Sequence, residues 1–259
     1  MPELPEVETI RRDLEKKILG KRIFKVEVKD QRSLQGKSVA KFKKELIGNE
    51  FIDIDRRGKL LIFKFSLPSG EGNEGCVKRA SKFLLIHLKM TGQLLYMTRD
   101  SDNMMQVTAG GHSDKKINLK LPNSHTRIIF EFFDKSKLYF NDLRVFGYLK
   151  IVDEKKLREI EAKFGVEPLS LGLTLGLILG IMKNKKTSIK AFLLNQKNIA
   201  GIGNIYADEI CFASGIRPSR KLDSLSDEEK RRIFKNTRKI LKLAVEKRGT
   251  TFNLSLIHI

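Results

Sequence analysis

The feature that most constrains the fold is a change of sequence pattern near residue 150. Before this point the chain contains short runs that alternate apolar and polar residues, whereas after Lys150 the pattern is that of helices. A period of two is typical of half-buried strands, and a period near 3.6 is typical of amphipathic helices. We therefore expect an α+β protein with a β-rich domain at residues 1–150 and an all-helical domain at residues 151–251.

The β-rich half is predicted to begin with a helix and to continue as strands. Val7, Ile10, Leu14 and Ile18 are spaced three and four residues apart, which predicts a helix over residues 4–19. Eight short strands in about 120 residues favour a β-sandwich or a barrel, and we expect a sandwich. The runs lie at residues 22–28, 51–56, 59–65, 82–88, 93–97, 117–121, 127–133 and 137–141.

The second half is predicted to be helical at residues 153–163, 171–182, 187–194, 206–213 and 226–247. The last helix begins with a Ser-Asp-Glu-Glu capping-box pattern at Ser226. The uncharged run 168–182 would span only ~22 Å as a helix, which is short of a ~30 Å hydrocarbon core. Its glycines, Gly172, Gly176 and Gly180, lead us to expect a buried helix with one face thinned for close packing.

The charge of the chain favours a polyanionic partner. Lys and Arg number 51 against 31 Asp and Glu, a formal charge of +20. Residues 1–150 carry 30 basic and 19 acidic side chains, and residues 151–259 carry 21 and 12, so both halves are basic. This distribution is expected if nucleic acid lies across both halves. An anionic membrane is the alternative, although only residues 226–247 have the pattern of a basic amphipathic anchor.

Cysteine content and the N-terminus indicate a cytosolic protein. Cys76 and Cys211 are the two cysteines and cannot form a disulfide framework. The sequence has no Cys-x-x-Cys spacing, so we expect no metal site in this chain. The acidic, Pro-rich N-terminus is unlike a signal peptide.

The N-terminus also carries a chemical signal. The small second residue, Pro2, permits removal of the initiator Met, which leaves a secondary amine. An α-amino group has a pKa near ~7.7–8.0, so part of it is unprotonated at neutral pH and can attack a sugar C1′ to give an iminium. Glu3 and Glu6 are one helical turn apart and can supply acid and base groups beside it. The ordinary alternative is a helix start with acidic residues in its first turn.

The longer string Met-Pro-Glu-Leu-Pro-Glu-Val-Glu-Thr at residues 1–9 closely resembles the start of the bacterial formamidopyrimidine-DNA glycosylases. These base-excision-repair enzymes remove oxidised purines and then cleave the abasic site. The resemblance implies that Pro2 is the Schiff-base nucleophile, Glu3 the general acid/base and Glu6 a supporting carboxylate. The related endonuclease VIII group usually has Gly where this chain has Leu4.

Two further motifs resemble the same family in the same order. Arg-Arg-Gly-Lys at residues 56–59 resembles a hairpin whose lysine holds DNA phosphate, which implies that role for Lys59. Taken alone, it is an ordinary solvated turn. His-Leu-Lys-Met-Thr-Gly at residues 87–92 resembles a loop in which a histidine touches phosphate and a methionine enters the base stack. The resemblance gives these roles to His87 and Met90.

The companion loop and the DNA clamp follow. Asp-Leu-Arg-Val-Phe-Gly at residues 142–147 implies that Arg144 bonds the orphaned base and that Phe146 stacks beside the methionine. An apolar wedge replaces the stacking lost when a base flips out, although core packing is the ordinary explanation of each residue alone. Residues 195–206 resemble the family's helix–two-turn–helix clamp and place Asn204 and Tyr206 at DNA; an ordinary αα-hairpin turn is the alternative.

The resemblance ends near Thr251. The family continues into a loop over the flipped base and a zinc finger with one structural Zn²⁺, neither of which the chain contains, so we expect no cofactor here and weak activity. The last six residues, Leu254–Ile259, are also the translation of the end of a common transposon-based sequencing adapter. We therefore expect residues 252–259 to be a non-native tail; a natural short terminus with apolar core residues is the alternative.

The resemblance implies a DNA glycosylase with abasic-site lyase activity through β,δ-elimination. We expect a monomer that acts on damaged double-stranded DNA in the bacterial cytoplasm, at the nucleoid, with no membrane partner. Two alternatives stay open, a non-catalytic damaged-DNA-binding module and an endonuclease VIII-like pyrimidine-lesion glycosylase. The joint presence of Pro2, Glu3 and Lys59 speaks against the first, and Leu4 speaks against the second.

Overall fold

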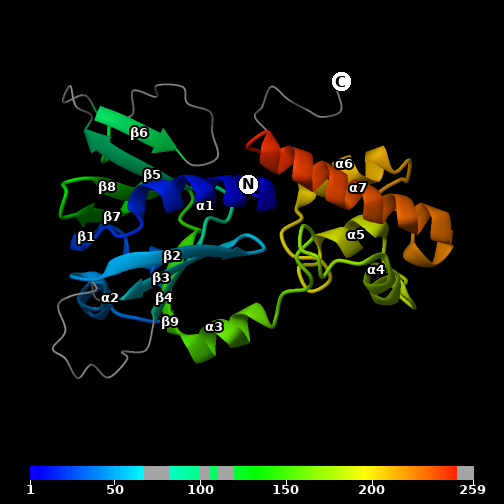
Figure 1. Ribbon diagram of the computed structural model, residues 1–259, viewed down its shortest axis with the longest axis horizontal. Helices are drawn as coiled ribbons and strands as arrows, with labels where there is room; N and C mark the ends of the chain where they lie inside the picture. The colour runs from blue at the N-terminus through cyan, green and yellow to red at the C-terminus, as the bar shows by residue number, and fades with distance from the viewer. Residues whose placement is uncertain (67–81, 100–104, 110–119, 250–259) are drawn as a thin grey trace. The chain divides into compact units, whose positions relative to one another are not determined.

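The computed structural model describes residues 1–66, 82–99, 105–109 and 120–249, so the expected tail at 252–259 lies outside it. Contacts divide the chain into two compact units, drawn in Figure 1. The first unit contains Met1–Pro2, Val7–Arg56 and Leu60–Glu159. The second contains Glu3–Glu6, Arg57–Lys59 and the chain from Ile160 onward. By contacts, the start of the N-terminal helix and the tip of one hairpin therefore belong with the helical unit.

The first unit is a sandwich of two sheets, which confirms the predicted fold class. In the described ranges one sheet has five strands in the order β1-β7-β8-β5-β6 and the other has four in the order β2-β3-β4-β9. The strands are β1 (Ile23–Val28), β2 (Glu50–Arg57), β3 (Leu60–Ser66), β4 (Lys82–His87), β5 (Gly92–Arg99), β6 (Met105–Ala109), β7 (Thr126–Phe132), β8 (Lys137–Asp142) and β9 (Tyr148–Asp153).

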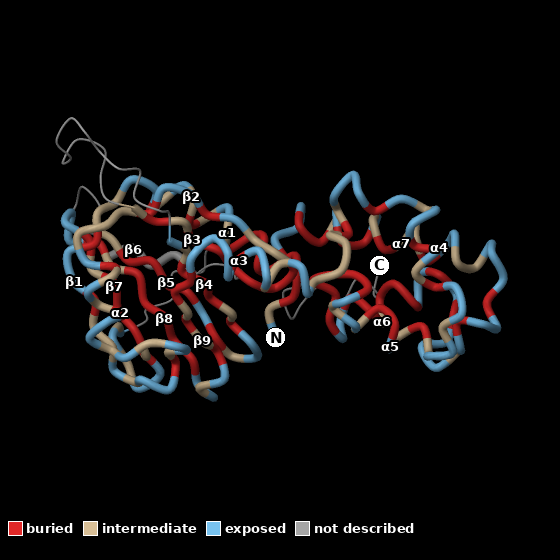
Figure 2. Tube along the Cα trace, turned by 90° about the horizontal axis from the view of Figure 1, so that it is seen from below, coloured by how far each residue is buried: buried red, intermediate tan, exposed pale blue. Residues whose placement is uncertain are grey.

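One hydrophobic core is shared by both sheets and by α1 (Leu4–Ile18). The helix contributes Val7, Ile10, Leu14 and Ile18, the four positions that its periodicity predicted. Phe51 of β2 packs its ring 5.3 Å from that of Phe63 in the same sheet and 6.4 Å from that of Phe130 in the other, between ring centres. Such aromatic contacts fix how the two sheets face each other. Figure 2 shows the buried course of these strands.

The structure adds elements that the sequence pattern missed. The helix α2 (Val39–Leu46) starts after Ser38, whose side chain accepts a hydrogen bond from the Lys41 backbone, and it buries Phe42 and Leu46. Strand β9 crosses residue 150, where we expected the strands to have ended. Of the strand predicted at 117–121, residues 117–119 lie outside the described ranges, and residues 120–121 are not in a strand. Between β5 and β7 the structure instead describes β6 at Met105–Ala109. The described chain thus has nine strands rather than eight.

The second unit is built from helices around its own core. The helices that follow the strands are α3 (Glu154–Glu161), α4 (Leu175–Met182), α5 (Ile189–Leu194), α6 (Asn204–Ala213) and α7 (Asp227–Glu246), although by contacts most of α3 belongs to the first unit. A short 3-10 turn lies at Leu222–Ser224 in the second unit, and another lies at Gln31–Ser33 in the first. The core joins α4 to α7 through residues such as Phe192, Tyr206 and Leu241. The predicted capping box is present, because Ser226 and Glu229 each accept a hydrogen bond from the other's backbone.

The prediction of a buried, glycine-thinned helix at 171–182 is wrong in two respects. The helix begins at Leu175, after Thr174 caps its first turn, and it buries Ile178 and Met182. Gly176 and Gly180 are exposed, and a Cβ added at either would meet no atom within 4 Å. The glycines therefore lie on the solvent side. Among the helices that the structure describes, none has the length and apolarity needed to cross a membrane.

Candidate active site

Glu3 lies just before α1 and is held by the backbone at the start of α6. Its carboxylate accepts hydrogen bonds from the backbone N–H groups of Gly203 at 2.6 Å, Ile205 at 3.0 Å and Tyr206 at 3.4 Å. The first N–H groups of a helix have no partner within the helix, and the helix dipole favours a negative charge there. The anion at this helix start is therefore a carboxylate of the protein itself, and Glu3 is only 1% exposed.

Burial changes the acid–base properties of two groups in this cluster. Burial raises the pKa of Glu3 above its usual value, against the charge of Lys59 and the three backbone hydrogen bonds, which lower it. Burial likewise lowers the pKa of the Lys59 amine, against the charges of Glu3 and Glu6. Both shifts bring a normally charged group closer to its neutral form. Carboxyl and amine groups whose pKa values are shifted in these directions are typical of proton-transfer sites.

Glu6 connects Glu3 to Tyr206 in the same cluster. One of its carboxylate oxygens accepts from the Tyr206 hydroxyl at 2.8 Å, and the other accepts from the Glu3 backbone N–H at 2.9 Å. Tyr206 is fully buried and Glu6 is 8% exposed. The Tyr206 side chain therefore positions a carboxylate within the protein, which differs from the DNA contact that the resemblance implies. Asn204, in contrast, is exposed at the first position of α6.

The tip of the β2–β3 hairpin is anchored in the helical unit. The Arg57 guanidinium donates to the Gly165 carbonyl at 2.7 Å, and the Gly58 N–H donates to the Glu167 carboxylate at 2.5 Å. These contacts differ from the solvated turn that the four-residue motif suggests on its own. They fix the backbone directly before Lys59, which is 8% exposed.

Two glycines allow the close approach of chain segments around the carboxylates. A Cβ at Gly203 would lie 2.3 Å from the Glu3 Cδ and 2.6 Å from the Lys59 Nζ. A Cβ at Gly249, whose φ is +95°, would lie 2.8 Å from a Glu6 carboxylate oxygen. Sequence reasoning missed Gly249, because nothing in a lone glycine after a helix indicates a contact with the N-terminus. Pro2 directly precedes Glu3 and is partly buried.

The first unit brings together the three residues predicted to enter the base stack. The Arg144 guanidinium contacts the Met90 sulfur at 3.4 Å and lies over the Phe146 ring, 4.7 Å from its centre. Met90 and Phe146 are 47% and 53% exposed. The two loops thus present one mixed apolar and cationic tip to solvent.

Asp142 ties these two loops together. It is 1% exposed, and its carboxylate accepts from the Thr91 hydroxyl, from the Arg144 N–H at 3.2 Å and from the Gly147 N–H at 2.7 Å. Sequence reasoning gave Asp142 no role, although an Asp whose side chain bonds backbone groups further along the chain is a known turn signal. His87, at the base of the first loop, accepts from the Lys89 N–H at 3.0 Å.

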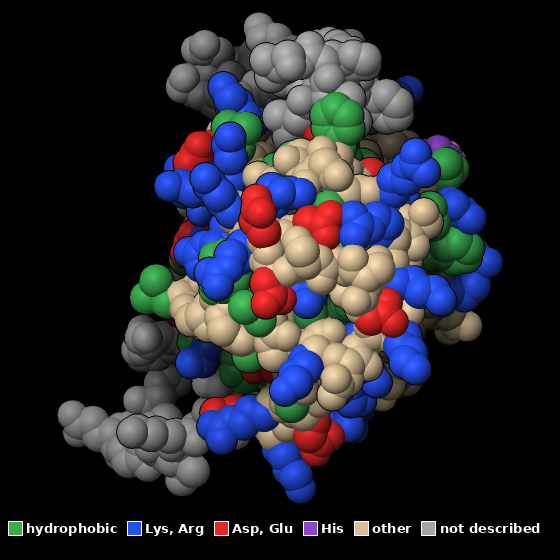
Figure 3. Space-filling model, turned by 90° about the vertical axis from the view of Figure 1, so that its right-hand side faces the viewer, with side chains coloured by type: hydrophobic (Ala, Val, Ile, Leu, Met, Phe, Trp, Pro, Cys, Tyr) green, Lys and Arg blue, Asp and Glu red, His purple; other side chains and the backbone are tan. Residues whose placement is uncertain are grey.

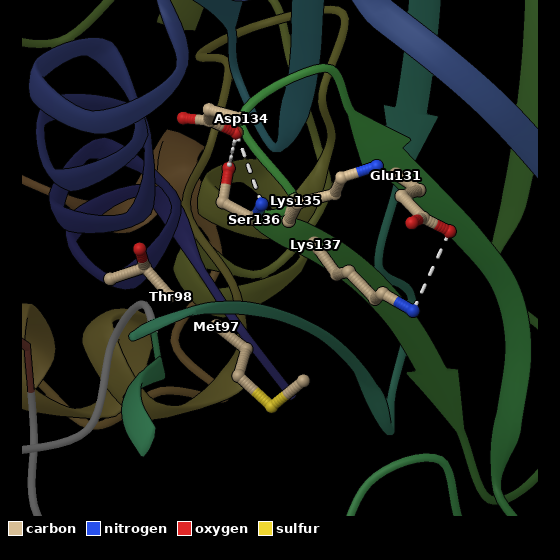
Figure 4. Close-up of a pocket in the computed structure, with 7 residues that line it drawn as sticks. All are labelled: Met97, Thr98, Glu131, Asp134, Lys135, Ser136 and Lys137. Atoms are coloured by element: carbon tan, nitrogen blue, oxygen red, sulfur yellow. Dashed lines mark hydrogen bonds and ion pairs between the residues drawn. The ribbon is translucent and has the colours of Figure 1, made fainter. Parts of the chain in front are cut away.

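Other features of the described chain offer no competing site. A pocket on the five-stranded sheet is shown in Figure 4, and three of its charged groups have partners among the lining residues: Lys137 pairs with Glu131 at 3.5 Å, and Asp134 accepts from the Ser136 N–H at 3.0 Å. No group of three or more His, Cys, Asp or Glu in the described ranges could hold a metal ion. The chain has two cysteines, fewer than the four of a structural zinc site built from two Cys pairs.

Two family models match the chain. Residues 1–149 match the N-terminal domain of formamidopyrimidine-DNA glycosylase, and residues 164–255 match its H2TH domain. Among curated relatives, the formamidopyrimidine-DNA glycosylase of Carboxydothermus hydrogenoformans is 39% identical over 251 residues, with 97% of this chain and 80% of the relative covered. That of Listeria monocytogenes is 36% identical over 254 residues, with 97% and 81% covered.

Solved structures agree with these matches. A complex of Lactococcus lactis Fpg with DNA containing an abasic site has a TM-score of 0.77 and 28% identity, covering 97% of this chain and 81% of that one. The wild-type Lactococcus lactis Fpg with DNA containing N7-benzyl-Fapy-dG has a TM-score of 0.78 and 28% identity, covering 97% and 82%. By sequence and by structure, the chain belongs to the formamidopyrimidine-DNA glycosylase family.

Proposed function

We propose that this DNA glycosylase removes oxidised purines, formamidopyrimidine and 8-oxoguanine, from duplex DNA and then cleaves the abasic site. The observation that carries the proposal is the buried cluster of Glu3, Glu6 and Lys59. Glu3 directly follows Pro2 in the sequence. The names of the relatives, and the abasic and Fapy-dG complexes of the Lactococcus protein, support damaged duplex DNA as the partner.

The proposed chemistry begins at the amine of Pro2 after Met1 has been removed. The amine nitrogen attacks C1′ of the damaged nucleotide, a bond forms from nitrogen to C1′, and the bond from C1′ to the base breaks. The departing base takes up a proton, and the Pro2 nitrogen loses its own. The sugar ring then opens as its oxygen takes up a proton, which gives an iminium. Loss of a C2′ proton then expels the 3′-phosphate, and a second elimination expels the 5′-phosphate. An amine and carboxylates suffice for these steps, and no cofactor is required.

Glu3 is the proposed proton carrier for these steps. A carboxyl whose pKa is raised by burial keeps its proton to a higher pH than an exposed carboxyl does, so it can give a proton to the opening sugar and take one back during elimination. Glu6 fixes the Glu3 backbone, and through Tyr206 it fixes the start of α6. We assign Lys59 to a phosphate beside the damaged nucleotide, since its amine lies in reach of this cluster and the charges of Glu3 and Glu6 act on it.

DNA contacts are proposed for both parts of the chain. Residues 1–150 act as the catalytic domain, and residues 151–251 act as the DNA-binding domain with Asn204 on a phosphate. In the first unit, Met90 and Phe146 enter the stack and Arg144 bonds the orphaned base, with His87 at an adjacent phosphate. Their exposure and mutual contacts support this assignment. We further propose that the protein acts as a monomer on the bacterial nucleoid, in the cytoplasm.

The alternative of a non-catalytic binding module is less well supported. Burying a carboxylate and an amine together costs free energy unless the pair is used or well compensated. A module that only binds DNA would have no need of Glu3 and Lys59 in buried positions.

A lesion panel tests the proposal. Single-turnover excision would be measured on matched duplexes that carry 8-oxoguanine, a formamidopyrimidine or an oxidised pyrimidine, with a Glu3→Gln control. We expect the two purine lesions to be removed fastest and Glu3→Gln to remove none at a comparable rate. Faster removal of the pyrimidine lesion would contradict the assigned substrate class. Tight binding to all duplexes without excision would support the binding module instead.

A further inference from the structure

The seven basic residues of the long helix α7 form two groups, which differ in whether their side chains have partners within the described residues. Three of them are engaged within the unit: Lys230 pairs with Asp227 at 3.1 Å, Arg232 pairs with Glu228 at 3.3 Å, and Arg238 donates to the Leu173 carbonyl at 3.1 Å. These contacts hold the cations close to the helix and its neighbours.

The remaining four are Arg231, Lys235, Lys239 and Lys242, here called the α7 stripe. All four are exposed, and within the described residues no hydrogen bond or ion pair engages their side chains. They follow one another at intervals of four, four and three residues, so they lie within a sector of about 80° on one face of the helix. The helix therefore presents an uninterrupted row of four unpaired cations.

The α7 stripe faces away from the core of its own unit. The buried residues of α7, which include Ile233, Ile240 and Leu241, are centred about 150° around the helix from the stripe. These residues pack in the core that also contains α6, and the start of α6 holds the Glu3 carboxylate. The stripe is therefore not part of the Glu3 cluster.

The stripe has the dimensions and the charge of a surface that binds a nucleic-acid backbone. The eleven steps of helical rise from Arg231 to Lys242 extend about 16 Å, a length over which one strand of duplex DNA presents about five phosphates. Exposed Glu228 and Glu246 lie on α7 just beyond the two ends of the row. Lys and Arg also dominate the charged side chains on the face of the molecule in Figure 3, in keeping with the charge of +20.

We propose that the α7 stripe is a second DNA-binding surface, which holds phosphates of undamaged DNA and takes no part in bond breaking. This proposal rests on the proposed function in one respect, namely that the polyanionic partner is DNA. Contacts between cations and phosphates carry no sequence information and depend strongly on salt. The stripe thus supplies affinity for undamaged DNA during the search for a lesion.

A charge-matched pair of variants tests this surface. The stripe variant carries Gln at Arg231, Lys235, Lys239 and Lys242. The control variant carries Gln at four exposed cations scattered over other helices, Lys16, Lys41, Lys44 and Lys155, and so has the same net charge. Binding to an undamaged duplex would be measured between 50 and 200 mM salt. Each lost phosphate contact reduces the slope of log affinity against log salt concentration by about 0.9. We therefore expect this slope to be about 2–3.6 smaller for the stripe variant, and far less changed for the control.

In absolute terms, affinity of the wild type should fall roughly 15- to 150-fold more over this salt range than that of the stripe variant. Equal slopes for the stripe and control variants would overturn the proposal, since net charge alone would then explain binding. The proposal would also be overturned, in favour of a membrane surface, if the stripe variant kept the wild-type salt slope for DNA but lost binding to anionic lipid vesicles.

Cleavage of an abasic duplex at saturating enzyme separates this inference from the proposed function. We expect the same single-turnover rate for the wild type and the stripe variant. A selective loss in the stripe variant would overturn the proposal by placing the stripe in the catalytic DNA site. Failure of the wild type to cleave would instead contradict the proposed function and leave the salt test on undamaged DNA intact.

Discussion

At the scale of single residues, Glu3 combines burial with hydrogen bonds that favour its charged form. Because burial has the larger effect, its pKa is raised, and the folded protein holds this proton more tightly than the unfolded chain does. The stabilising contribution of this proton is therefore present at low pH and is lost as the pH rises from about 4.5 through the folded pKa.

The direction of this pH dependence can be tested by comparing the stability of the wild type with that of Glu3→Gln. Relative to Glu3→Gln, the free energy of unfolding of the wild type should decline as the pH is raised from about 4.5 through the folded pKa of Glu3. Urea unfolding at each pH measures both proteins, and titrating groups that do not interact with Glu3 cancel in the difference. A difference that rises with pH would show that the N–H groups and Lys59 outweigh burial.

Gly203 offers a second test at the residue scale. The methyl group of Gly203→Ala would overlap the Glu3 carboxyl, so either Glu3 or the start of α6 must move. We expect base excision to fall by a factor of about ten or more, since small misplacements of catalytic groups are costly. The matched control is Gly176→Ala, on the open side of α4, which should keep full activity and gain up to about 1 kcal/mol of stability. Equal activity of the two variants would show that Glu3 is not held as described.

At the scale of elements, the two loops joined by Asp142 form one unit with one proposed task. Ala substitutions at Met90 and Phe146 should impair base excision from duplex DNA more than cleavage of a preformed abasic site. An abasic site is already partly unstacked, so less free energy is needed to flip it out. Single-turnover rates on the two substrates decide the matter, and equal losses on both would indicate damaged folding instead.

Local patterns predicted the elements well where the apolar spacing was regular. The helix α1 and the capping box of α7 follow directly from nearby residues. The helix α2 was missed although Phe42 and Leu46 have helical spacing, because it lies between strands. The mistake in α4 has another cause, since a row of glycines has the same sequence whether it faces a partner or water.

At the scale of the whole molecule, the site could be predicted only as a set of residues, not as a geometry. The hydrogen bond from Gly203 to Glu3 joins residues 200 positions apart. The second unit likewise collects Glu3–Glu6 and Arg57–Lys59 from the sandwich half of the sequence. No periodic pattern within a short stretch of sequence predicts contacts between residues so far apart. The family resemblance supplied the identity of Glu3, Glu6 and Lys59, whereas the role of Tyr206 became visible only in the structure.

The charge of +20 makes a prediction for the molecule as a whole. If about 6–10 phosphates are contacted, affinity for damaged duplex DNA should fall roughly 10³–10⁵-fold between 50 and 200 mM salt. Fluorescence anisotropy with a labelled duplex would measure this dependence. A flat response would contradict DNA as the partner that explains the charge.

The central claim is that the amine of Pro2 forms a covalent imine with an abasic site. Borohydride reduction should trap a complex of the protein with abasic DNA, and peptide mass spectrometry should locate the adduct on Pro2. A variant with an N-terminal extension, which removes the free amine, should give no adduct. Equal trapping of the extended protein, or an adduct on Lys59, whose amine pKa is lowered by burial, would show that Pro2 is not the nucleophile.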